Sequence, residues 1–300
     1  MADPGFDPDA YTKPFQLTKA LHRDVYSAVD LTNPQLSAEN KTVLITGGGG
    51  TLGKAVAKAW AAAHVYQVVL VGRRSGPLEQ AEAEIRSINP AVKTSIETAD
   101  TRNEAEVKAL FEKLAKQEIK VDAVVDAAGA INTAVTGTLE PSMWFNDFEA
   151  NVKAPYLLSH YMMATYGDQQ GTIIVMASNA AALVVPGMSS YACSKLAVTR
   201  VLEFLQIEHP KMRFFALSPG NVASPLTNPG FLPFAKDTGA LAGGWTLFLA
   251  TQRADYMKGG FLNVNWDVDE MESHREVIEK EGLLKLGFIK AQLGPSGHPF

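Results

Sequence analysis

The residues best suited to chemistry are a tyrosine and a lysine four positions apart, Tyr191 and Lys195, in the stretch "SSYACSKLAV". This spacing places both side chains on one face of a helix. A free phenol has a pKa of about 10, so it exchanges protons poorly at neutral pH. Because a neighbouring ammonium stabilises phenolate, we expect Lys195 to lower the pKa of Tyr191 and to make it a usable acid/base.

Two further polar residues precede this pair. Ser178 follows the apolar run "GTIIVMA" (171–177), and Asn151 lies in the helical segment before that run. A serine at the carboxyl end of a strand faces the crevice in which doubly wound folds bind ligands. Its hydroxyl can hold a substrate oxygen beside the phenol, where negative charge develops. The set predicts reduction of a carbonyl, or the reverse oxidation of an alcohol.

A run of four glycines lies between an apolar run and a helical pattern in "TVLITGGGGTLG" (42–53). In this strand–glycine–helix context, glycines let the backbone approach a pyrophosphate at the helix N-terminus, so we predict a dinucleotide site instead of a flexible turn. The sequence leaves three registers open: Gly48, Gly50 and Gly53 as G-x-G-x-x-G; Gly47, Gly50 and Gly53 as T-G-x-x-G-x-x-G; or Gly47 and Gly53 as T-G-x-x-x-G-x-G with Thr51 in place of a glycine.

The segment after the second predicted strand bears on the choice of cofactor. No acid occurs between Gly47 and Leu78, and the strand runs into Arg73 and Arg74. An acid would repel the 2′-phosphate of NADP(H), whereas an arginine binds it with charge-assisted hydrogen bonds. We therefore expect NADP(H). The alternative is that both arginines are solvated loop residues.

The elements that must position these residues alternate regularly along the chain. Apolar runs predict strands at 42–46, 67–71, 93–98, 121–127, 171–177, 213–218 and 259–265. Helical patterns occupy 53–63, 77–87, 103–117, 143–165, 189–208 and 240–251. Strands that are apolar on both faces and alternate with helices imply an α/β fold, a single doubly wound Rossmann-type domain whose parallel sheet has helices on both faces.

This domain is expected over residues 41–265, between an N-terminal arm at 1–40 and a C-terminal helical extension at 266–300. The extension packs on the domain or on a neighbouring subunit. The glycine- and proline-rich stretch 223–245 suits a segment that covers a substrate. Its larger apolar residues either form a wall over the substrate or pack down on the domain: Phe231, Leu232, Phe234 and Trp245.

Composition excludes several classes of function. A net charge of −5 argues against a nucleic-acid partner. The single cysteine, Cys193, excludes an internal disulfide framework and fits a reducing compartment. No run reaches the roughly 18 apolar residues of a membrane span, and the acidic, proline-containing start is not a secretory signal. The histidines lack metal-ligand spacing. We expect a cytoplasmic protein with no metal and no membrane partner.

Taken in order, the glycine stretch, Asn151, Ser178 and Tyr191-x-x-x-Lys195 resemble the short-chain dehydrogenase/reductase family. "LSPGNVASP" is similar to the family's Pro-Gly segment after the sixth strand, and "ADT" (99–101) to its adenine-side acid after the third. The resemblance covers roughly residues 41–265. The Ser–Tyr spacing and the chain length favour the compact single-domain branch. "HRDVYSAVD" and "NVNWDVDE" resemble fungal members.

The resemblance implies a role for each matching residue. Tyr191 would be the acid/base, Lys195 would also bind the nicotinamide ribose, Ser178 would orient the carbonyl, and Asn151 would anchor a water in a proton relay. Together with the arginines, the implied cofactor contacts are Gly47, Gly50, Thr51, Leu52, Gly53, Arg73, Arg74, Asp100, Thr101, Asp126, Ala128, Gly129, Pro219, Gly220, Val222 and Ser224. Asp100 would contact the adenine and Val222 the nicotinamide amide. A homo-oligomer, dimer or tetramer, is also implied, with helix 143–165 as one contact.

Three positions depart from the family pattern. Thr51 replaces the middle glycine, "DAAG" (126–129) replaces Asn-Asn-Ala-Gly, and His64 stands where a glycine usually ends the helix. We expect Asp126 to bond the backbone near the glycine loop and the Thr51 hydroxyl to face the cofactor phosphates. Two other functions stay open: a biosynthetic enzyme of this fold that directs a cyclisation, and a non-catalytic NADP(H)-binding sensor or scaffold.

Overall fold

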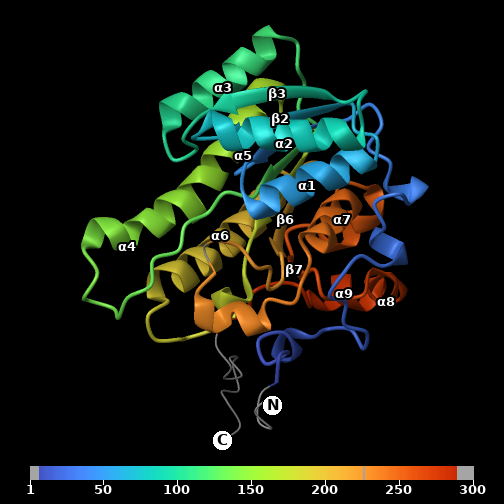
Figure 1. The fold of residues 1–300 in the computed structure, drawn as a ribbon. Helices are drawn as coiled ribbons and strands as arrows, with labels where there is room; N and C mark the ends of the chain where they lie inside the picture. The colour runs from blue at the N-terminus through green and yellow to red at the C-terminus, as the bar shows by residue number, and fades with distance from the viewer. Residues whose placement is uncertain (1–6, 226, 289–300) are drawn as a thin grey trace, which may run out of the picture.

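A parallel seven-stranded sheet runs through the part of the chain that this computed structural model describes, residues 7–225 and 227–288 (Figure 1). The strand order is β3-β2-β1-β4-β5-β6-β7. The strands are β1 Thr42–Thr46, β2 Gln67–Gly72, β3 Lys93–Thr98, β4 Ala123–Asp126, β5 Thr172–Met176, β6 Arg213–Ser218 and β7 Phe261–Asn263. All strands are parallel, but the chain adds β2 and β3 on one side of β1 and β4 to β7 on the other. Because the strand order switches between β1 and β4, a ligand crevice is expected at their carboxyl ends. The predicted doubly wound fold is confirmed.

Helices cover both faces of the sheet (Figure 1). They are α1 Thr51–Ala62, α2 Ser75–Ile88, α3 Glu104–Lys116, α4 Pro141–Phe148, α5 Ala154–Tyr166, α6 Ser189–Glu208, α7 Gly239–Leu249, α8 Val268–Ser273 and α9 Arg275–Glu281. The helix expected at 143–165 is not one regular helix, because a π-helical turn, Glu149–Lys153, joins α4 to α5. Within the described ranges, no helix is long and apolar enough to cross a membrane.

Successive side chains of β1 are buried on opposite faces of the sheet, which explains why its sequence is continuously apolar. Val43 and Ile45 belong to the core beneath α1 and α7, whereas Leu44 belongs to the core beneath α3, α5 and α6. All three side chains are fully buried. Successive side chains of a strand point to opposite faces, so a strand covered on both sides needs apolar residues at every position.

The arm and the extension both contact this domain. Val29 of the arm is buried against α7, where a Cβ on Gly244 would collide with the Val29 carbonyl. Residues of α8 and α9, including Val268 and Ile278, join the same core. Beyond α9, the Leu284 carbonyl accepts a hydrogen bond from the Phe261 amide of the edge strand β7 at 2.9 Å. Residues 1–6 of the expected arm and 289–300 of the expected extension lie outside the described residues.

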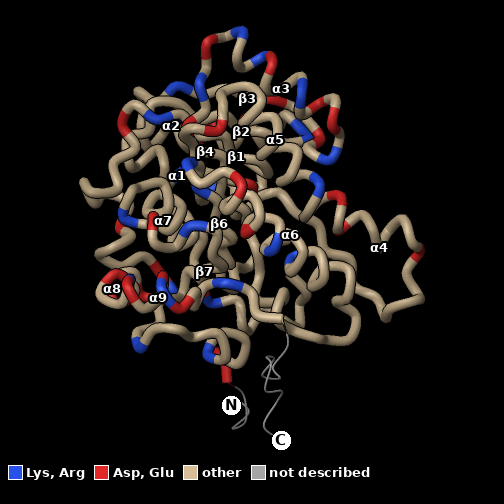
Figure 2. Tube along the Cα trace, turned by 180° about the vertical axis from the view of Figure 1, so that it is seen from behind, with Lys and Arg blue, Asp and Glu red and all other residues tan. Residues whose placement is uncertain are grey.

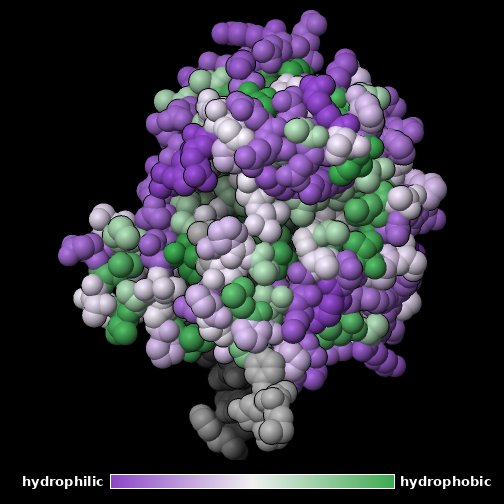
Figure 3. All heavy atoms as spheres, in the orientation of Figure 1, coloured by the Kyte–Doolittle hydropathy of each residue, from purple (hydrophilic) through white to green (hydrophobic). Residues whose placement is uncertain are grey.

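The surface differs from one end of the molecule to the other. Figure 2 shows Lys and Arg interspersed with Asp and Glu along the trace. In Figure 3 hydrophilic residues predominate at the top of the molecule, and apolar residues gather where α4 protrudes. Met143 and Phe145 of α4 and Val135 of the preceding loop are 47%, 58% and 64% exposed. Large exposed apolar groups at one place suit a contact with an apolar ligand or partner.

Candidate active site

Tyr191 and Lys195 lie in the first turns of α6, beside the carboxyl end of β5. Lys195 is buried, and its Nζ donates to the carbonyl oxygen of Met176, the last residue of β5, at 2.6 Å. This Nζ is 5.8 Å from the centre of the Tyr191 ring. Ser178 follows β5; its hydroxyl forms a hydrogen bond with Tyr191 and accepts one from the Ala180 amide at 3.1 Å. The structure thus brings together the three side chains singled out by the sequence.

The protonation of this group differs from the expectation. Burial raises the pKa of Tyr191, the hydrogen bond with Ser178 opposes the rise, and the Asp147 charge adds to it. The expectation that Lys195 lowers the pKa of Tyr191 is therefore wrong for the net direction of the shift. Desolvation of the phenolate is the largest effect, and the lysine nitrogen donates its hydrogen bond to Met176. Burial also lowers the pKa of Lys195 to about 8, against the charges of Asp126 and Asp147. Tyr191 is therefore a neutral proton donor at pH 7.

Asn151 occupies the centre of the π-helical turn and is buried. Its Oδ1 accepts a hydrogen bond from the Ala130 amide at 3.1 Å, and its Nδ2 donates to the Ala130 carbonyl at 2.9 Å. Nδ2 also donates to Ser194 of α6 at 3.0 Å. A Cβ on Gly129 would lie 3.1 Å from Asn151 Oδ1 and 3.8 Å from Lys195 Nζ. Asn151 therefore ties the loop after β4 to α6, and its expected water contact stays a prediction.

The backbone of the glycine loop favours the two registers that begin at Gly47. Gly47 has a φ of +60°, and a Cβ there would lie 2.8 Å from the Ala127 carbonyl oxygen. A Cβ on Gly53 would lie 2.7 Å from the Gly47 carbonyl carbon. Gly50 is the N-cap of α1 and leaves the first turn without a side-chain cap. Gly47 and Gly53 belong to both T-G-x-x-G-x-x-G and T-G-x-x-x-G-x-G, so the choice between these two registers stays open.

This helix end suits a phosphate group. The N–H groups in the first turn of a helix lack intrahelical partners, and the helix dipole favours a negative charge there. Thr51 is the first residue of α1 and is exposed, and Leu52 is half-buried beside it. The absence of a side chain at Gly53 lets the start of α1 approach the Gly47 backbone closely. The loop therefore fits the pyrophosphate of a dinucleotide.

Asp126 links the glycine loop to the catalytic residues. It is buried at the end of β4, where it accepts a hydrogen bond from the Thr46 hydroxyl at the end of β1. The same hydroxyl accepts a hydrogen bond from the Ala128 amide at 3.2 Å. Burial raises the pKa of Asp126 to about 6, against the effects of Thr46 and Lys195. The "DAAG" departure thus holds the ends of β1 and β4 together through Thr46.

The arginines after β2 and the acid after β3 lie near each other. Arg73 and Arg74 are exposed. The Asp100 carboxylate binds Arg102, with Arg102 Nε 2.9 Å from Oδ1, and Arg102 Nη1 donates to Asn146 of α4 at 2.7 Å. The hydrogen bond with Arg102 and, to a smaller extent, the charge of Arg73 lower the pKa of Asp100. The Asp100 carboxylate, expected near the adenine, thus already has an arginine partner; Thr101 beside it is buried.

The segment after β6 begins at a position that requires glycine. After Pro219, Gly220 has a φ of +75°, and a Cβ there would lie 2.5 Å from Asp237 Oδ2. Val222 forms a β-bridge with Asp237. The Ser224 amide donates to Thr227 Oγ1 at 2.9 Å. The expected nicotinamide contacts therefore lie on a segment whose course depends on Asp237.

The larger apolar residues of 223–245 were expected either to form a wall over a substrate or to pack on the domain, and they do not all behave alike. Trp245 is fully buried in α7 and belongs to the core. Phe231 and Phe234 instead pack against Tyr11 of the arm, with ring centres 5.0 and 4.8 Å away. Leu232 is 47% exposed. Trp245 therefore packs down on the domain, whereas the apolar residues before α7 pack against the arm or are exposed.

Sequence reasoning missed a buried carboxylate next to Tyr191. Asp147 of α4 is fully buried and accepts hydrogen bonds from the amide and Nδ2 of Asn132, at 3.0 and 2.7 Å. It also accepts one from the hydroxyl of Ser190, the residue before Tyr191, at 2.6 Å. The available signal was an acid four residues, about one helical turn, before Asn151.

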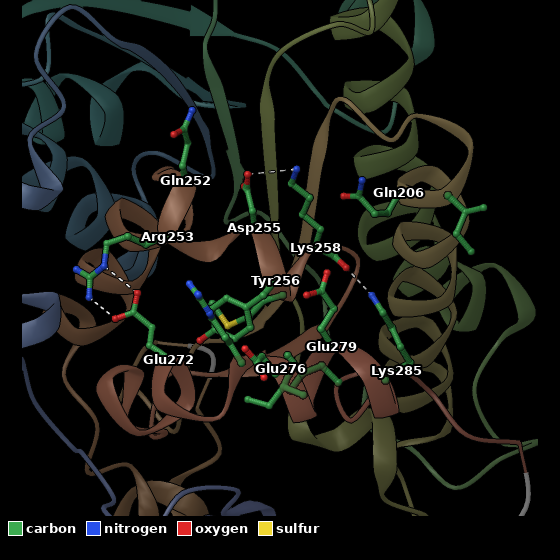
Figure 4. A pocket seen from close by; sticks show the side chains of 16 residues that line it. Gln206, Gln252, Arg253, Asp255, Tyr256, Lys258, Glu272, Glu276, Glu279 and Lys285 are labelled. Carbon is green, nitrogen blue, oxygen red and sulfur yellow. Dashed lines mark hydrogen bonds and ion pairs between the residues drawn. The ribbon is translucent and has the colours of Figure 1, made fainter.

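A cavity of about 970 Å³ lies between the end of α6, the turn Gln252–Met257 and α9 (Figure 4). Its charged side chains bind one another: Arg253 Nε lies 2.9 Å from Glu272, and Lys258 lies 3.5 Å from Asp255. Lys285 donates to the Lys258 carbonyl. The residues that line this cavity do not include the predicted catalytic ones. It is thus separate from the candidate active site.

The glycine loop at α1 and the Ser–Tyr–Lys group at β5 together define a dinucleotide-binding oxidoreductase of the doubly wound class. A family model described as short chain dehydrogenase matches residues 41–231. The chain therefore belongs to the short-chain dehydrogenase/reductase family, whose members use nicotinamide cofactors.

Relatives of similar length occur in fungi. The chain is 27% identical to the short chain dehydrogenase/reductase AacuD of Aspergillus aculeatus, over 94% of this chain and 98% of that protein. It is 28% identical to nsrO of Aspergillus novofumigatus, over 91% and 96%.

Solved structures confirm the fold. A short-chain type dehydrogenase/reductase from Mycobacterium ulcerans superposes with a TM-score of 0.70 at 20% identity, over 84% of this chain and all of that one. Levodione reductase gives 0.69 at 20% identity, over 75% and 96%.

Proposed function

We propose that the protein is an NADPH-dependent reductase that converts a ketone or aldehyde of an apolar small molecule to the alcohol. The observation that carries this proposal is the neutral phenol of Tyr191, hydrogen-bonded to Ser178, with the buried ammonium of Lys195 one helical turn away. A phenol that is protonated near pH 7 can donate the proton that reduction of a carbonyl requires.

In this mechanism, the substrate carbonyl oxygen accepts hydrogen bonds from Ser178 and Tyr191. NADPH, when bound, supplies the hydride that reduces the carbonyl carbon. The O–H bond of Tyr191 then breaks, and its proton passes to the developing alkoxide. The Lys195 ammonium stabilises the phenolate that is left, and Asn151 holds the α6 end of the site in register with the loop after β4.

The proposed cofactor site extends along the carboxyl edge of the sheet. The first turn of α1 would bind the pyrophosphate, Arg73 and Arg74 the 2′-phosphate, and the Val222 segment the nicotinamide. Arg73 is exposed, and its only described charge contact is the longer-range one with Asp100, so its guanidinium is available to a phosphate. These features support NADPH over NADH.

The apolar nature of the substrate is supported by the rim of the site. The loop before α4 and the loop before α6 are joined by a hydrogen bond from the Ala134 amide to the Gly187 carbonyl at 3.0 Å. Val135 and Val184 of these loops are largely exposed, as is Phe145 of α4. A substrate that buries these side chains gains binding free energy from the area removed from water.

The test is an NADPH-oxidation screen against ketones of graded size, repeated with NADH. Tyr191→Phe should abolish turnover and leave NADPH binding intact, whereas Tyr66→Phe, exposed near the start of β2, should behave as the unchanged enzyme. Arg73→Ala should weaken the binding of NADPH and leave the binding of NADH unaffected. Full turnover by Tyr191→Phe would refute the catalytic role, and tight NADPH binding without any turnover would favour a sensor or scaffold.

We also propose a homo-oligomer in the cytoplasm, with no nucleic-acid partner. Helices α5 and α6 carry exposed apolar side chains, Tyr156 at 50%, Phe204 at 59% and Ile207 at 79%, which a subunit contact would cover. The single cysteine fits a reducing compartment. Light scattering of the purified protein measures the oligomeric state, and a monomeric mass would overturn that part of the proposal.

A further inference from the structure

The arm contacts the segment that follows β6 at several points. This covering segment, residues 219–238, carries Val222 and the 3₁₀ turn Pro229–Phe234. Asn221 Nδ2 donates to the hydroxyl of the buried Thr12 at 3.2 Å. The Thr238 amide donates to the Arg23 carbonyl at 3.0 Å, and the Thr238 hydroxyl donates to Asp24 at 2.6 Å. The arm therefore binds both ends of the covering segment.

Asp237 lies at the centre of these contacts, and its side chain is 0% exposed. Its carboxylate accepts hydrogen bonds from Arg23 Nη1 at 2.9 Å, from Asn265 Nδ2 at 2.7 Å and from the Asn221 amide. A buried carboxylate is stable only when paired and hydrogen-bonded, and Arg23 is the cation in direct contact with it among the described residues. The arm thus supplies the counter-charge on which the covering segment depends.

The other side of the arm is held by the chain after β7. The His22 amide donates to the Asn265 carbonyl at 2.9 Å, and Asn265 Nδ2 donates back to the His22 carbonyl at 2.8 Å. Trp266 Nε1 donates to the Phe15 carbonyl at 2.6 Å. Figure 1 shows this first, dark-blue part of the chain below the sheet, close to the orange covering segment. The arm is therefore anchored to the chain after β7 as well as to the covering segment, and Asn265 bonds both.

We propose that the arm is a strap that positions the covering segment over the active site, with Arg23 as the positioning residue and Tyr11 as part of the apolar wall. The proposal rests on the proposed function in one respect: the covering segment must face cofactor and substrate. Tyr11 packs on Phe231 and Phe234 while its own ring stays 40% exposed. A change at Tyr11 therefore alters the wall without disturbing the core.

The test is hydrogen–deuterium exchange of the full-length protein, followed by mass spectrometry. In Arg23→Met, exchange across residues 219–238 should rise roughly 10- to 100-fold, as expected when a hydrogen bond to a buried charge is lost. Arg23→Lys should restore much of the protection. Arg253→Met is the control, because Arg253 is similarly exposed and pairs with Glu272. Its own contact with the arm is to Gln35, which is not among the arm residues that bond the covering segment. This control should raise exchange around 252–281 and leave 219–238 unchanged.

Two further measurements tie exchange to the active site. NADPH should slow exchange in both the arm and the covering segment, because ligand and strap stabilise the same closed arrangement. In Arg23→Met, the Kd for NADPH and the KM for a ketone found in the screen should rise several-fold, with a smaller effect on kcat. Tyr11→Ala should raise KM for large ketones more than for small ones, at an unchanged unfolding temperature.

Unchanged exchange across 219–238 in Arg23→Met overturns the proposal, whatever the enzyme does. Faster exchange with unaltered NADPH affinity and KM also overturns it, because the strap would then be structural only. If NADPH protects both segments from exchange and Arg23→Met removes that protection, the proposal of a strap is supported. This support holds even if no carbonyl compound is reduced, because that result refutes the proposed reaction and not the strap.

Discussion

A methyl group added at Gly53 tests the close contact between α1 and the glycine loop. In Gly53→Ala, the new Cβ would lie 2.7 Å from the Gly47 carbonyl carbon and 2.9 Å from the Gly48 Cα. Carbon atoms in favourable contact are about 3.5–4.0 Å apart, so α1 must move outward by nearly an ångström. All the opposing atoms are backbone, and Gly47 is already at positive φ. No side-chain rotation relieves the overlap.

The expected cost follows from this overlap. Overpacking costs about 1–3 kcal/mol, and we expect the upper end because the backbone itself is displaced. Alanine regains up to about 1 kcal/mol of helix propensity, which leaves a net loss of about 2 kcal/mol. For a chain of this size the unfolding temperature should fall by roughly 3 °C. Displacing the α1 amides should also weaken NADPH binding by roughly 10- to 100-fold, the value of one hydrogen bond to a charged group.

Thermal unfolding and NADPH fluorescence titration measure the two effects without requiring turnover. Gly76→Ala is the matched control, since Gly76 lies in α2 and a Cβ there meets no atom within 4 Å. It should leave NADPH affinity unchanged and raise stability slightly. A Gly53→Ala protein that unfolds at the wild-type temperature and binds NADPH with the wild-type Kd would refute the packing argument.

Two acids near the site give further predictions. Asp126 has a folded pKa of about 6 against 3.8 in an unfolded chain, so its ionisation lowers stability as the pH rises through that window. Asp126→Asn stays neutral and should gain up to about 3 kcal/mol over wild type near pH 7, with no gain below about pH 4; an equal difference in denaturant unfolding at both pH values contradicts this. Lys195 loses its charge above about pH 8, so kcat/KM for reduction should fall there. Asp147→Asn removes a charge that raises the pKa of Lys195, so the alkaline fall of kcat/KM should move to lower pH. A fall at the same pH as in the wild type would rule out this electrostatic role.

Local patterns in the sequence were sufficient wherever a residue's neighbours in the chain decide its state. The apolar run 42–46 became β1 with every side chain buried, because a parallel strand covered on both faces requires it. His64 was predicted to stand in for a helix-ending glycine, and it has a φ of +61°. Tyr191 and Lys195 share a face of α6 because their spacing is about one helical turn.

The π-helical turn around Asn151 is the first feature that the local pattern did not show. The stretch 143–165 has a continuous helical pattern, yet the chain widens by a turn where Asn151 bonds both the loop after β4 and Ser194 of α6. Its partners are 21 and 43 residues away. The interruption therefore depends on contacts that helix periodicity does not encode.

By itself, the sequence determined the alternating strands and helices, the glycine loop and the residue types of the Ser–Tyr–Lys group, since each depends on periodicity or spacing over a few residues. The tertiary structure alone decided that position 47 requires glycine, which direction the Tyr191 pKa shifts and that Arg23 pairs with Asp237. Each of these depends on which atoms from distant parts of the chain meet and on how much water they exclude. Burial and long-range contact are properties of the folded chain, and they set both the acidity of the phenol and the course of the segment after β6.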